Sequence, residues 1–530
     1  MKPMKIFAYA NEHPQEILAV TDGGEKIRYG ELTDLAGQLG SAVGHRLVFV
    51  LCRNTPGSLL GYLGLLQSGG VPLLLDADIA PQLLKDLMET YHPAFCLFPD
   101  DLPPQTGDVI REAMAGISPQ REKTGEPKLF EHKDAAISPQ GEKADRKIRD
   151  YRLCRTAAEG ENPVLAPDLR LLLTTSGSTG SSKLVRISGD NLDANADSIV
   201  EYLQITKDER PITVLPMQYS YGMSILHTHV MVGAPILLTS YTLMERAFWE
   251  RMQQERATSL CGVPYTFEMY SRLGLMEMDL PDLHYITQAG GKLPEKRHMQ
   301  FARWCADKGI RFYVMYGQTE ASPRMGWLPP EKAIEKCGSM GIAIPGGTID
   351  LIDENGNVIP PENTTDTSGQ TKTDSGKTGD TSTGPVGELV YTGPNVALGY
   401  ARCAADLSKG DEFGGVLHTG DMARRDADGY LYIVGRRSRF IKMAGKRVGL
   451  DEVEKILRAA FPEPDLACAG KDDELHVYVV PADTEVENLE EQICTCIQEM
   501  TGIQERRVRV FAVPEIPRNS SGKIRYAALK

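Results

Sequence analysis

Three apolar, strand-like runs of this chain each end in a loop rich in glycine or hydroxyl side chains, and this repeated pattern restricts the fold more than any other feature. The runs end near residues 174, 289 and 315, and the loops that follow are 175–183, Gly290-Gly291 and Tyr316-Gly317. Ligands of open α/β sheets bind beyond the carboxyl ends of the strands. We therefore expect the three loops to meet around one ligand.

The first loop, Thr175–Lys183, reads TSGSTGSSK and holds two glycines, six hydroxyl side chains and one lysine. Glycine allows backbone N–H groups to approach an anion closely, and lysine adds a positive charge. The loop is not a P-loop, because Ser182 rather than glycine precedes the lysine. Its position directly after an apolar strand favours a polyphosphate site over the alternative, an ordinary Ser/Gly surface turn.

Strand-like and helix-like segments alternate over the first hundred residues, which is typical of a parallel sheet with helices on its faces. Ser188 or Asp190 is expected to cap a helix that runs to about Leu203. The predicted strands of this part and of the segment after that helix are Arg46–Cys52, Val71–Leu75, Ala94–Phe98 and Thr213–Pro216.

The last hundred residues predict a separate compact unit, and 530 residues are enough for a large domain with such an appendage. A helix is expected at Asp451–Ala460, and strands at 474–481 and 507–513 are expected to flank a helix at about 486–500. Two polar segments interrupt the regular pattern and are interpreted as surface insertions. They are 101–165, for which a docking role is the alternative, and 359–386, interpreted as a long hairpin tip.

The charge and cysteine pattern excludes several classes of protein. The chain has 58 basic and 72 acidic residues and a net charge of −14, which disfavours non-specific nucleic-acid binding. None of its ten cysteines lies in a pair or cluster with zinc spacing, so we expect reduced cysteines in a cytoplasmic protein. We expect neither a secretory signal nor a membrane span, because no apolar run of the required length is present.

Eight segments, in the family's order, resemble the motifs of the adenylate-forming (AMP-binding) superfamily of acyl-CoA synthetases, luciferases and peptide-synthetase adenylation domains. They are TSGSTGSSK (175–183), LPMQYSYGM (215–223), QAGGKLP (288–294), YGQTE (316–320), GELVYTGPNVALGY (387–400), HTGD (418–421), GRRSRFIKMAGKRV (435–448) and NSSGKIR (519–525). The resemblance covers nearly the whole chain. It implies an α/β fold, with a large N-terminal domain (1–436) of α/β subdomains plus a β-barrel-like part, hinged to a small, mobile α+β C-terminal domain (437–530).

The superfamily activates a carboxylic acid as acyl-AMP, releases pyrophosphate, and transfers the acyl group to a thiol, so the resemblance implies an AMP-forming ligase. It implies that 175–179 and Lys183 hold the β- and γ-phosphates, that Tyr316 faces adenine, that Thr319 reaches the α-phosphate and that Asp421 accepts both ribose hydroxyls. The full set of implied ATP- and AMP-binding residues is Thr175, Ser176, Gly177, Ser178, Thr179, Gly180, Lys183, Gly290, Gly291, Tyr316, Gly317, Gln318, Thr319, Asp421 and Arg436.

The implied catalytic residues are Lys523, Thr319, Glu320 and Lys442. Lys523 matches the lysine that bridges the acid and the α-phosphate, and Glu320 matches the carboxylate that binds Mg²⁺, a cation commonly held by one or two carboxylates and phosphates. Lys442 matches a position that assists the first half-reaction in some members. The hinge position falls on Ser438, which departs from the family because serine lacks the charge usual there.

The acid pocket is expected to include Tyr219, Ser220, Tyr221 and Tyr265. In amino-acid-activating members an aspartate pairs with the substrate ammonium, and Ser220 occupies that position here. We therefore expect a fatty or other non-amino acid. The alternatives are a free-standing amino-acid activator and a non-catalytic nucleotide-binding homologue.

The acceptor thiol is expected to come from another molecule, because the chain ends seven residues after Lys523. Either CoA or the phosphopantetheine of a separate carrier protein meets this requirement. ATP and Mg²⁺ are the other expected co-substrate and cofactor. His227 and His229 are interpreted as packing residues rather than ligands.

Overall fold

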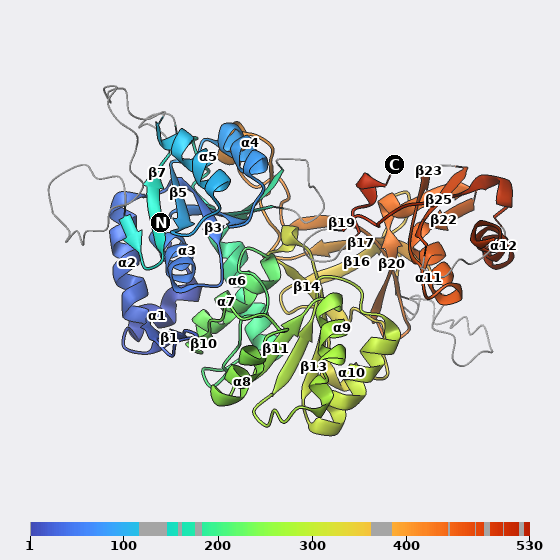
Figure 1. The fold of residues 1–530 in the computed structure, drawn as a ribbon, viewed down its shortest axis with the longest axis horizontal. Helices are drawn as coiled ribbons and strands as arrows, with labels where there is room; N and C mark the ends of the chain where they lie inside the picture. The colour runs from blue at the N-terminus through green and yellow to red at the C-terminus, as the bar shows by residue number, and fades with distance from the viewer. Residues whose placement is uncertain are drawn as a thin grey trace, which may run out of the picture.

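The computed structural model describes residues 2–115, 146–156, 162–174, 183–361, 384–443, 446–471, 473–481, 488–501, 503–518 and 524–529. Figure 1 shows a broad body built from the N-terminal and middle parts of the chain, with a smaller C-terminal unit at one side. The helices of the body are α1 (Ala8–Glu12), α2 (Tyr29–Ala42), α3 (Pro56–Ser68), α4 (Pro81–Tyr91), α5 (Pro104–Ala115), α6 (Gly189–Leu203), α7 (Ser220–Val232), α8 (Arg246–Gln254), α9 (Pro264–Arg272) and α10 (Glu295–Lys308).

An eight-stranded sheet forms the N-terminal part of the body, in the order β18-β9-β8-β4-β3-β5-β7-β6. Its central neighbours β8, β4, β3 and β5 are parallel, as the alternation of strands and helices predicts, whereas the outer strands pair antiparallel. The strands are β3 (Leu47–Cys52), β4 (Val71–Asp76), β5 (Phe95–Pro99), β6 (Arg146–Ile148), β7 (Tyr151–Arg155), β8 (Leu169–Thr174), β9 (Leu184–Ser188) and β18 (Gly399–Ala401).

A five-stranded sheet, in the order β11-β12-β13-β14-β15, forms the middle of the body. The strands β11, β12 and β13 are parallel, and β14 turns back antiparallel to β13. The strands are β11 (Ser259–Gly262), β12 (Tyr285–Gln288), β13 (Arg311–Gly317), β14 (Arg324–Leu328) and β15 (Ile342–Ala343). A small sheet beside it joins β10 (Ile236–Leu237), β1 (Ile17–Val20) and β2 (Lys26–Arg28).

The predicted strand at Thr213–Pro216 is wrong, because only single bridges form nearby, at Pro211 and Ile212. The Thr213 hydroxyl accepts a hydrogen bond from the Thr239 backbone at 2.9 Å, so a side chain replaces part of the ladder.

The predicted cap of α6 is confirmed. Ser188 Oγ accepts from the backbone N–H of Asn191 at 3.1 Å, and the side-chain oxygen of Asn191 accepts from the backbone N–H of Ser188 at 2.9 Å.

The segment 101–165, expected to be an insertion, contains more regular structure than predicted. Pro104–Ala115 forms α5, and β7 pairs with β5 along its whole length, so that Tyr151 is fully buried. Three of the five side chains of β7 are buried, and its two partly exposed arginines, Arg152 and Arg155, gave this strand the composition of a loop. Residues 116–145 and 157–161 lie outside the described residues.

An antiparallel four-stranded sheet follows, in the order β16-β17-β19-β20, with no closing pair among the described strands. It occupies the place of the expected barrel-like part. Its strands are β16 (Thr348–Ile352), β17 (Val386–Thr392), β19 (Val416–Arg425) and β20 (Leu431–Arg436). Because β16 pairs with β17, the segment 359–386 does connect a hairpin, although 362–383 lies outside the described residues.

The C-terminal unit has the two helices and the strands predicted for it. It contains β21 (Phe440–Met443), β22 (Lys446–Gly449), α11 (Leu450–Ala460), β23 (Asp465–Lys471), β24 (Glu474–Val480), α12 (Leu489–Thr501) and β25 (Val508–Ala512). Its apolar core includes Ile441, Leu457, Val477 and Ile497 and shares no member with the cores of the body. This separation supports the two-domain division, whose boundary at 436–437 stays a prediction.

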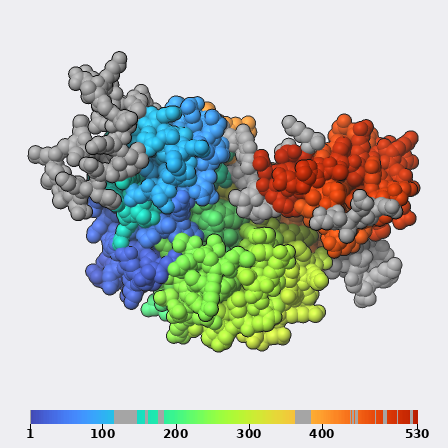
Figure 2. Space-filling model, in the orientation of Figure 1, coloured from blue at the N-terminus to red at the C-terminus, as the bar shows by residue number. Residues whose placement is uncertain are grey.

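Two ion pairs connect the C-terminal unit to the body. Lys455 of α11 lies 3.2 Å from Glu295 of α10, and Arg437 lies 2.8 Å from Glu388 of β17. Both side chains of the Lys455–Glu295 pair are exposed, so this pair contributes little binding energy, whereas Glu388 of the second pair is buried. Figure 2 shows the unit as a distinct mass, with a hollow between it and the N-terminal part of the body.

All ten cysteines are free thiols. Among the described residues, no group of three or more His, Cys, Asp or Glu side chains could hold a metal ion. Within the same stretches of chain, no helix is both long and apolar enough to cross a membrane.

The fully buried side chain of Arg186 joins β9 to the segment around β18. It donates to the carbonyl oxygens of Tyr400, Gly410 and Leu398 at 3.1, 3.1 and 3.2 Å, to the Lys409 carbonyl, and to Glu412 at 2.6 Å. One guanidinium therefore satisfies several buried carbonyl groups and fixes the β9–β18 pair. Tyr400 of β18 and Lys183, which directly precedes β9, belong to the site described below.

We expect Arg186→Met to lower the free energy of unfolding by about 3 kcal/mol, because the buried carbonyl groups lose their donors. Urea denaturation followed by tryptophan fluorescence measures the change. The matched control is Arg246→Met, since Arg246 is 90 % exposed and, among the residues that the structure describes, pairs only with Glu250 on the same helix. We expect the control to change stability by less than about 0.5 kcal/mol, and equal effects of the two variants would contradict this role of Arg186.

Candidate active site

The turn between β13 and β14 organises the site. A side chain at Gly317 would place its Cβ 2.0 Å from the carbonyl oxygen of Pro323, so only glycine fits. The Gln318 backbone donates to that same oxygen at 2.9 Å, and the Asn395 side chain donates to the Ala321 carbonyl at 2.6 Å. These contacts fix the short 3₁₀ helix Thr319–Ala321 inside the turn.

A carboxylate, a phenol and an ammonium group gather at this turn. Tyr400 Oη of β18 donates to Glu320 Oε1 at 2.8 Å, and Lys183 Nζ lies 3.3 Å from the centre of the Tyr400 ring. Burial lowers the pKa of Lys183, an effect that the nearby Glu320 charge opposes. Burial, and then Glu320, raise the pKa of Tyr400, so its hydroxyl remains a donor. The arrangement offers one cation and one carboxylate to a polyphosphate and its metal ion.

The buried carboxylate of Asp421 forms a second polar group on the other side of the turn. Its Oδ2 accepts from Tyr316 Oη at 2.5 Å and from Gln318 Nε2 at 2.9 Å, and its Oδ1 lies 3.0 Å from Arg436 Nε. Burial, followed by the Asp421 charge, raises the pKa of Tyr316 well above its ordinary value, so the phenol stays protonated.

These contacts modify the expectation that Asp421 accepts both ribose hydroxyls. A carboxylate has about four acceptor positions, and three are already occupied. A ribose diol therefore has to displace one partner. Arg436 is the one that can leave, because its side chain is 61 % exposed.

The N-terminus of α7 and the glycine turn after β12 meet at the same place. Ser220 Oγ lies 3.5 Å from Thr319 Oγ1. A Cβ at Gly290 would lie 2.4 Å from Tyr219 Oη, and the φ of +81° at Gly290 also favours glycine. The residues described from the three loops therefore converge as predicted, although β8 belongs to a different sheet from β12 and β13.

The predicted acid-pocket residues do not all line one cavity. Tyr221 is buried beside it, and its hydroxyl donates to Thr287 Oγ1 at 2.7 Å. Tyr265 does not line this cavity and is 62 % exposed, so its place in the acid pocket stays a prediction. Its helix, α9, turns Thr266, Phe267 and Tyr270 inward, which leaves Tyr265 on the opposite face.

The cavity beside Tyr221 has a volume of about 20 Å³, within about 390 Å³ of space, including open solvent, that protein atoms do not fill. Sequence analysis missed most of its lining, including Arg324, which lies four residues after the YGQTE motif. The only sequence signal for Arg324 was its closeness to the YGQTE motif, which lies on the same hairpin. The lining combines apolar and polar side chains, among them Ile199, Ser224, Ile225, Thr287, Met315 and Arg324.

His227 and His229 are both buried, as their interpretation as packing residues requires, although His229 also lines the cavity. His227 Nε2 lies 2.7 Å from the Tyr62 hydroxyl, and burial lowers its pKa to about 3. His229 Nδ1 lies 2.7 Å from the Ile225 carbonyl, and burial lowers its pKa to about 4. Both imidazoles are therefore neutral at pH 7.

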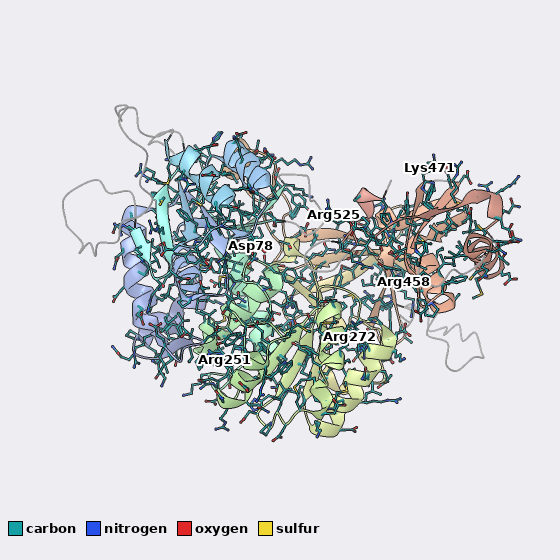
Figure 3. All side chains as sticks on the ribbon, viewed as in Figure 1. Asp78, Arg251, Arg272, Arg458, Lys471 and Arg525 are labelled. Atoms are coloured by element: carbon teal, nitrogen blue, oxygen red, sulfur yellow. The ribbon has the colours of Figure 1, made fainter. Side chains whose placement is uncertain are left out.

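Several predicted residues lie outside the part of the chain that the structure describes. They are Thr175, Ser176, Gly177, Ser178, Thr179, Gly180 and Lys523. Ser438 lies in the 3₁₀ helix Arg437–Arg439, and Lys442 lies in β21. In Figure 3, Arg525 lies on the edge of the C-terminal unit nearest the body. The roles of these residues stay predictions.

The carboxylate of Glu320 and the ammonium group of Lys183 fit a hard cation and a nucleoside triphosphate. Tyr400 occupies one oxygen of Glu320, and within the described stretches Oε2 has no hydrogen-bond partner. One free carboxylate oxygen, completed by phosphate oxygens and water, is a common environment for Mg²⁺. Lys183 beside it supplies the charge that a polyphosphate needs.

The chain matches a family model described as AMP-binding enzyme over residues 6–401. It is 27% identical over 375 residues to an indoleacetate–CoA ligase of Aromatoleum aromaticum, a match that covers 69% of this chain and 67% of that protein. It is also 27% identical over 360 residues to a 2-succinylbenzoate–CoA ligase of Bacillus cytotoxicus, covering 67% of this chain and 68% of that protein.

Solved structures show the same fold. An O-succinylbenzoate CoA synthetase from Bacillus subtilis, in complex with AMP, superposes with a TM-score of 0.73 at 21% identity, covering 100% of this chain and 98% of the other. ATP-bound MatB from Rhodopseudomonas palustris gives a TM-score of 0.69 at 22% identity, with the same coverage. The predicted α/β fold class is confirmed. Because the family model spans well over half of the sequence, the chain belongs to the AMP-binding enzyme family and is an AMP-forming ligase of the acyl-CoA synthetase type.

Proposed function

We propose that the protein joins a carboxylic acid to CoA in two steps through an acyl-AMP intermediate. The observation that carries this proposal is that Lys183 and Tyr400 lie together beside Glu320, which shares a hairpin turn with Thr319. This arrangement places phosphate-binding charge next to a hydroxyl group. The relatives named as CoA ligases support CoA as the acceptor.

In the first step a carboxylate oxygen attacks the α-phosphorus of ATP, and the bond to the β-phosphate oxygen breaks to release pyrophosphate. An anion attacks an anion, so the site has to neutralise charge on both. Lys183 carries the charge that binds the leaving polyphosphate, and Thr319 directs a hydroxyl toward the α-phosphate. When bound at Glu320, Mg²⁺ adds positive charge to the phosphate oxygens.

The nucleoside binds on the Asp421 side of the turn. The ribose hydroxyls donate to Asp421 after Arg436 yields its place, and Tyr316 supplies a flat face for adenine. Tyr316 and Gln318 hold the Asp421 carboxylate through their own hydrogen bonds, so the acceptor is oriented before ATP arrives.

In the second step the thiol sulfur attacks the acyl carbon, the bond from that carbon to the AMP oxygen breaks, and the thiol proton is released. Rotation of the C-terminal unit about Ser438 withdraws Lys523 and opens the site to the thiol. The contact between Lys455 and Glu295 opposes this rotation only weakly, because both side chains are exposed.

The substrate in this proposal is a non-amino acid. Ser220, at the first residue of α7, offers a hydroxyl where an amino-acid substrate needs a carboxylate for its ammonium group. No described side chain in the cavity lining is acidic. A buried ammonium would therefore be left without a counter-charge.

An exchange assay tests the reaction and the substrate class together. The purified full chain is incubated with ATP, Mg²⁺, labelled pyrophosphate and single acids from a panel of amino, fatty, aryl and dicarboxylic acids. We expect label to enter ATP with at least one non-amino acid and with no amino acid. Exchange with none of the acids would support a non-catalytic homologue, and exchange only with amino acids would overturn the assignment of Ser220.

Loss of the bridging lysine should affect only the first step. We expect Lys523→Ala to lower the rate of acyl-AMP formation by about 10²–10³-fold, the effect typical of losing one preorganised contact to a developing charge. Thioester formation from supplied acyl-AMP should change little. Lys471→Ala, on an exposed lysine of the same unit that pairs with Glu474, is the control. Equal rates for Lys523→Ala and the unaltered enzyme would refute the role of Lys523.

The Tyr400 hydroxyl should act through Glu320. We expect Tyr400→Phe to raise the KM for MgATP by roughly tenfold, because a hydrogen bond to a charged group contributes about 1.5–3 kcal/mol. In a Glu320→Gln background the same change should have a clearly smaller effect. Tyr432→Phe, which removes a hydrogen bond to Asp426 away from the site, is the control. Additive effects of the two site variants would contradict the coupling.

A further inference from the structure

Arg324 is a buried cation for which the described part of the chain provides no anion. The residue is 3 % exposed, and its Nε has no hydrogen-bond partner. One terminal nitrogen lies 3.5 Å from Ser224 Oγ, at the limit of a hydrogen bond. Buried charges in proteins are normally paired, because leaving water without a counter-charge is costly. The position of Arg324 therefore requires an explanation.

The backbone holds this arginine firmly in place. Its carbonyl oxygen accepts from Asn395 Nδ2 at 2.7 Å and from Asn195 Nδ2 at 3.2 Å, and the residue pairs with Gly317 at the start of β14. The guanidinium lies 4.2 Å from the centre of the Tyr221 ring. A cation–π contact orients the group but does not neutralise its charge.

The cavity beside Arg324 complements a small anion. Among its lining residues Arg324 carries the only charge, since burial keeps His229 neutral by lowering its pKa to about 4. Ser224, whose Oγ lies 3.5 Å from the guanidinium, and Thr287 add hydroxyl groups to the lining. Apolar side chains, including Ile199, Ile225, Leu260 and Met315, cover much of the remaining wall.

The cavity lies one residue along α7 from the place where the reacting carboxylate binds in the proposed function. Tyr221 lines the cavity, and the preceding residue, Ser220, lies 3.5 Å from Thr319. An acid that presents one carboxylate near Thr319 therefore extends its other end along apolar side chains toward Arg324. We propose that the substrate is a dicarboxylic acid with an apolar spacer, whose second carboxylate pairs with Arg324 and determines specificity.

This inference rests on the proposed function, and it identifies the class of acid within it. The second carboxylate supplies the missing counter-charge, accepting from the guanidinium in the paired geometry that arginine favours. A neutral end group in its place would leave the buried cation uncompensated. Sites built to bind a polar group discriminate strongly against analogues that lack it.

The first test compares each dicarboxylic acid with its own monomethyl ester, which keeps one reacting carboxylate and removes the second charge. Succinic, glutaric, adipic and phthalic acids and their monomethyl esters are the probes. We expect kcat/KM for the preferred diacid to exceed that of its ester by at least about 10²-fold. Arg324→Met should remove most of this ratio, and Arg324→Lys should keep part of it.

The control is Arg251→Met. Arg251, labelled in Figure 3, is also buried, but it pairs with Asp22 at 3.4 Å and donates to the Val20 carbonyl at 2.7 Å, outside the site. The diacid-to-ester ratio should be unchanged in this variant. An equal preference for ester and diacid in the unaltered enzyme, or an unchanged ratio in Arg324→Met, would overturn the proposal.

A measurement without turnover separates this inference from the proposed function. The thermal unfolding midpoint is recorded with a non-hydrolysable ATP analogue and each diacid or ester. We expect the preferred diacid to raise the midpoint of the unaltered protein and not that of Arg324→Met. Without ligand, Arg324→Met should unfold at the same temperature or higher, because an unpaired buried charge is removed.

The outcomes of these tests are distinguishable. A lower midpoint or loss of folding in ligand-free Arg324→Met would show that the charge already has a partner and would overturn the inference. Pyrophosphate exchange with monocarboxylic acids alone would also overturn it, while the proposed function stands. Stabilisation by diacids through Arg324, without exchange by any acid, would instead refute the proposed function.

Discussion

The close approach of Gly317 to the Pro323 carbonyl is the constraint on which the site depends. It closes the turn between β13 and β14 so tightly that only glycine fits, and the amides of Asn395 and Asn195 hold the turn from outside. Side chains from one end of the turn reach Asp421 of the antiparallel sheet and Tyr400 of the eight-stranded sheet. The turn thereby brings three sheets to one site.

Two cations near this turn, Lys183 and Arg324, differ in their electrostatic surroundings and in their proposed roles. Lys183 has Glu320 nearby, and their opposite charges suit a metal–polyphosphate complex, which brings both signs itself. Arg324 has no such partner among the described residues, and its cavity lining carries no negative charge. A buried charge that the protein leaves unpaired is explained if the substrate pairs it, so the same hairpin would bind ATP at one end and select the acid at the other.

The sequence predicts this site only in part, for physical reasons. Glycine and hydroxyl residues after apolar strands located the nucleotide side, because loop chemistry is local. The pairing of Tyr316 with Asp421 depends on contacts between residues far apart in sequence, and no local pattern contains it. The burial of β7 was hidden by its two partly exposed arginines, and the exposure of Tyr265 follows from the orientation of α9. For Arg324 the sequence shows a charge, but not the absence of a nearby acid.

The transfer of oxygen from the acid to AMP tests the central claim most directly. The preferred acid, labelled with ¹⁸O in its carboxyl groups, is converted with ATP and CoA, and the products are analysed by mass spectrometry. If the carboxylate attacks the α-phosphorus and the thiol later cleaves the acyl–oxygen bond, each AMP carries one ¹⁸O and the pyrophosphate carries none. Label in pyrophosphate or orthophosphate, or unlabelled AMP with thioester formed, would contradict the account.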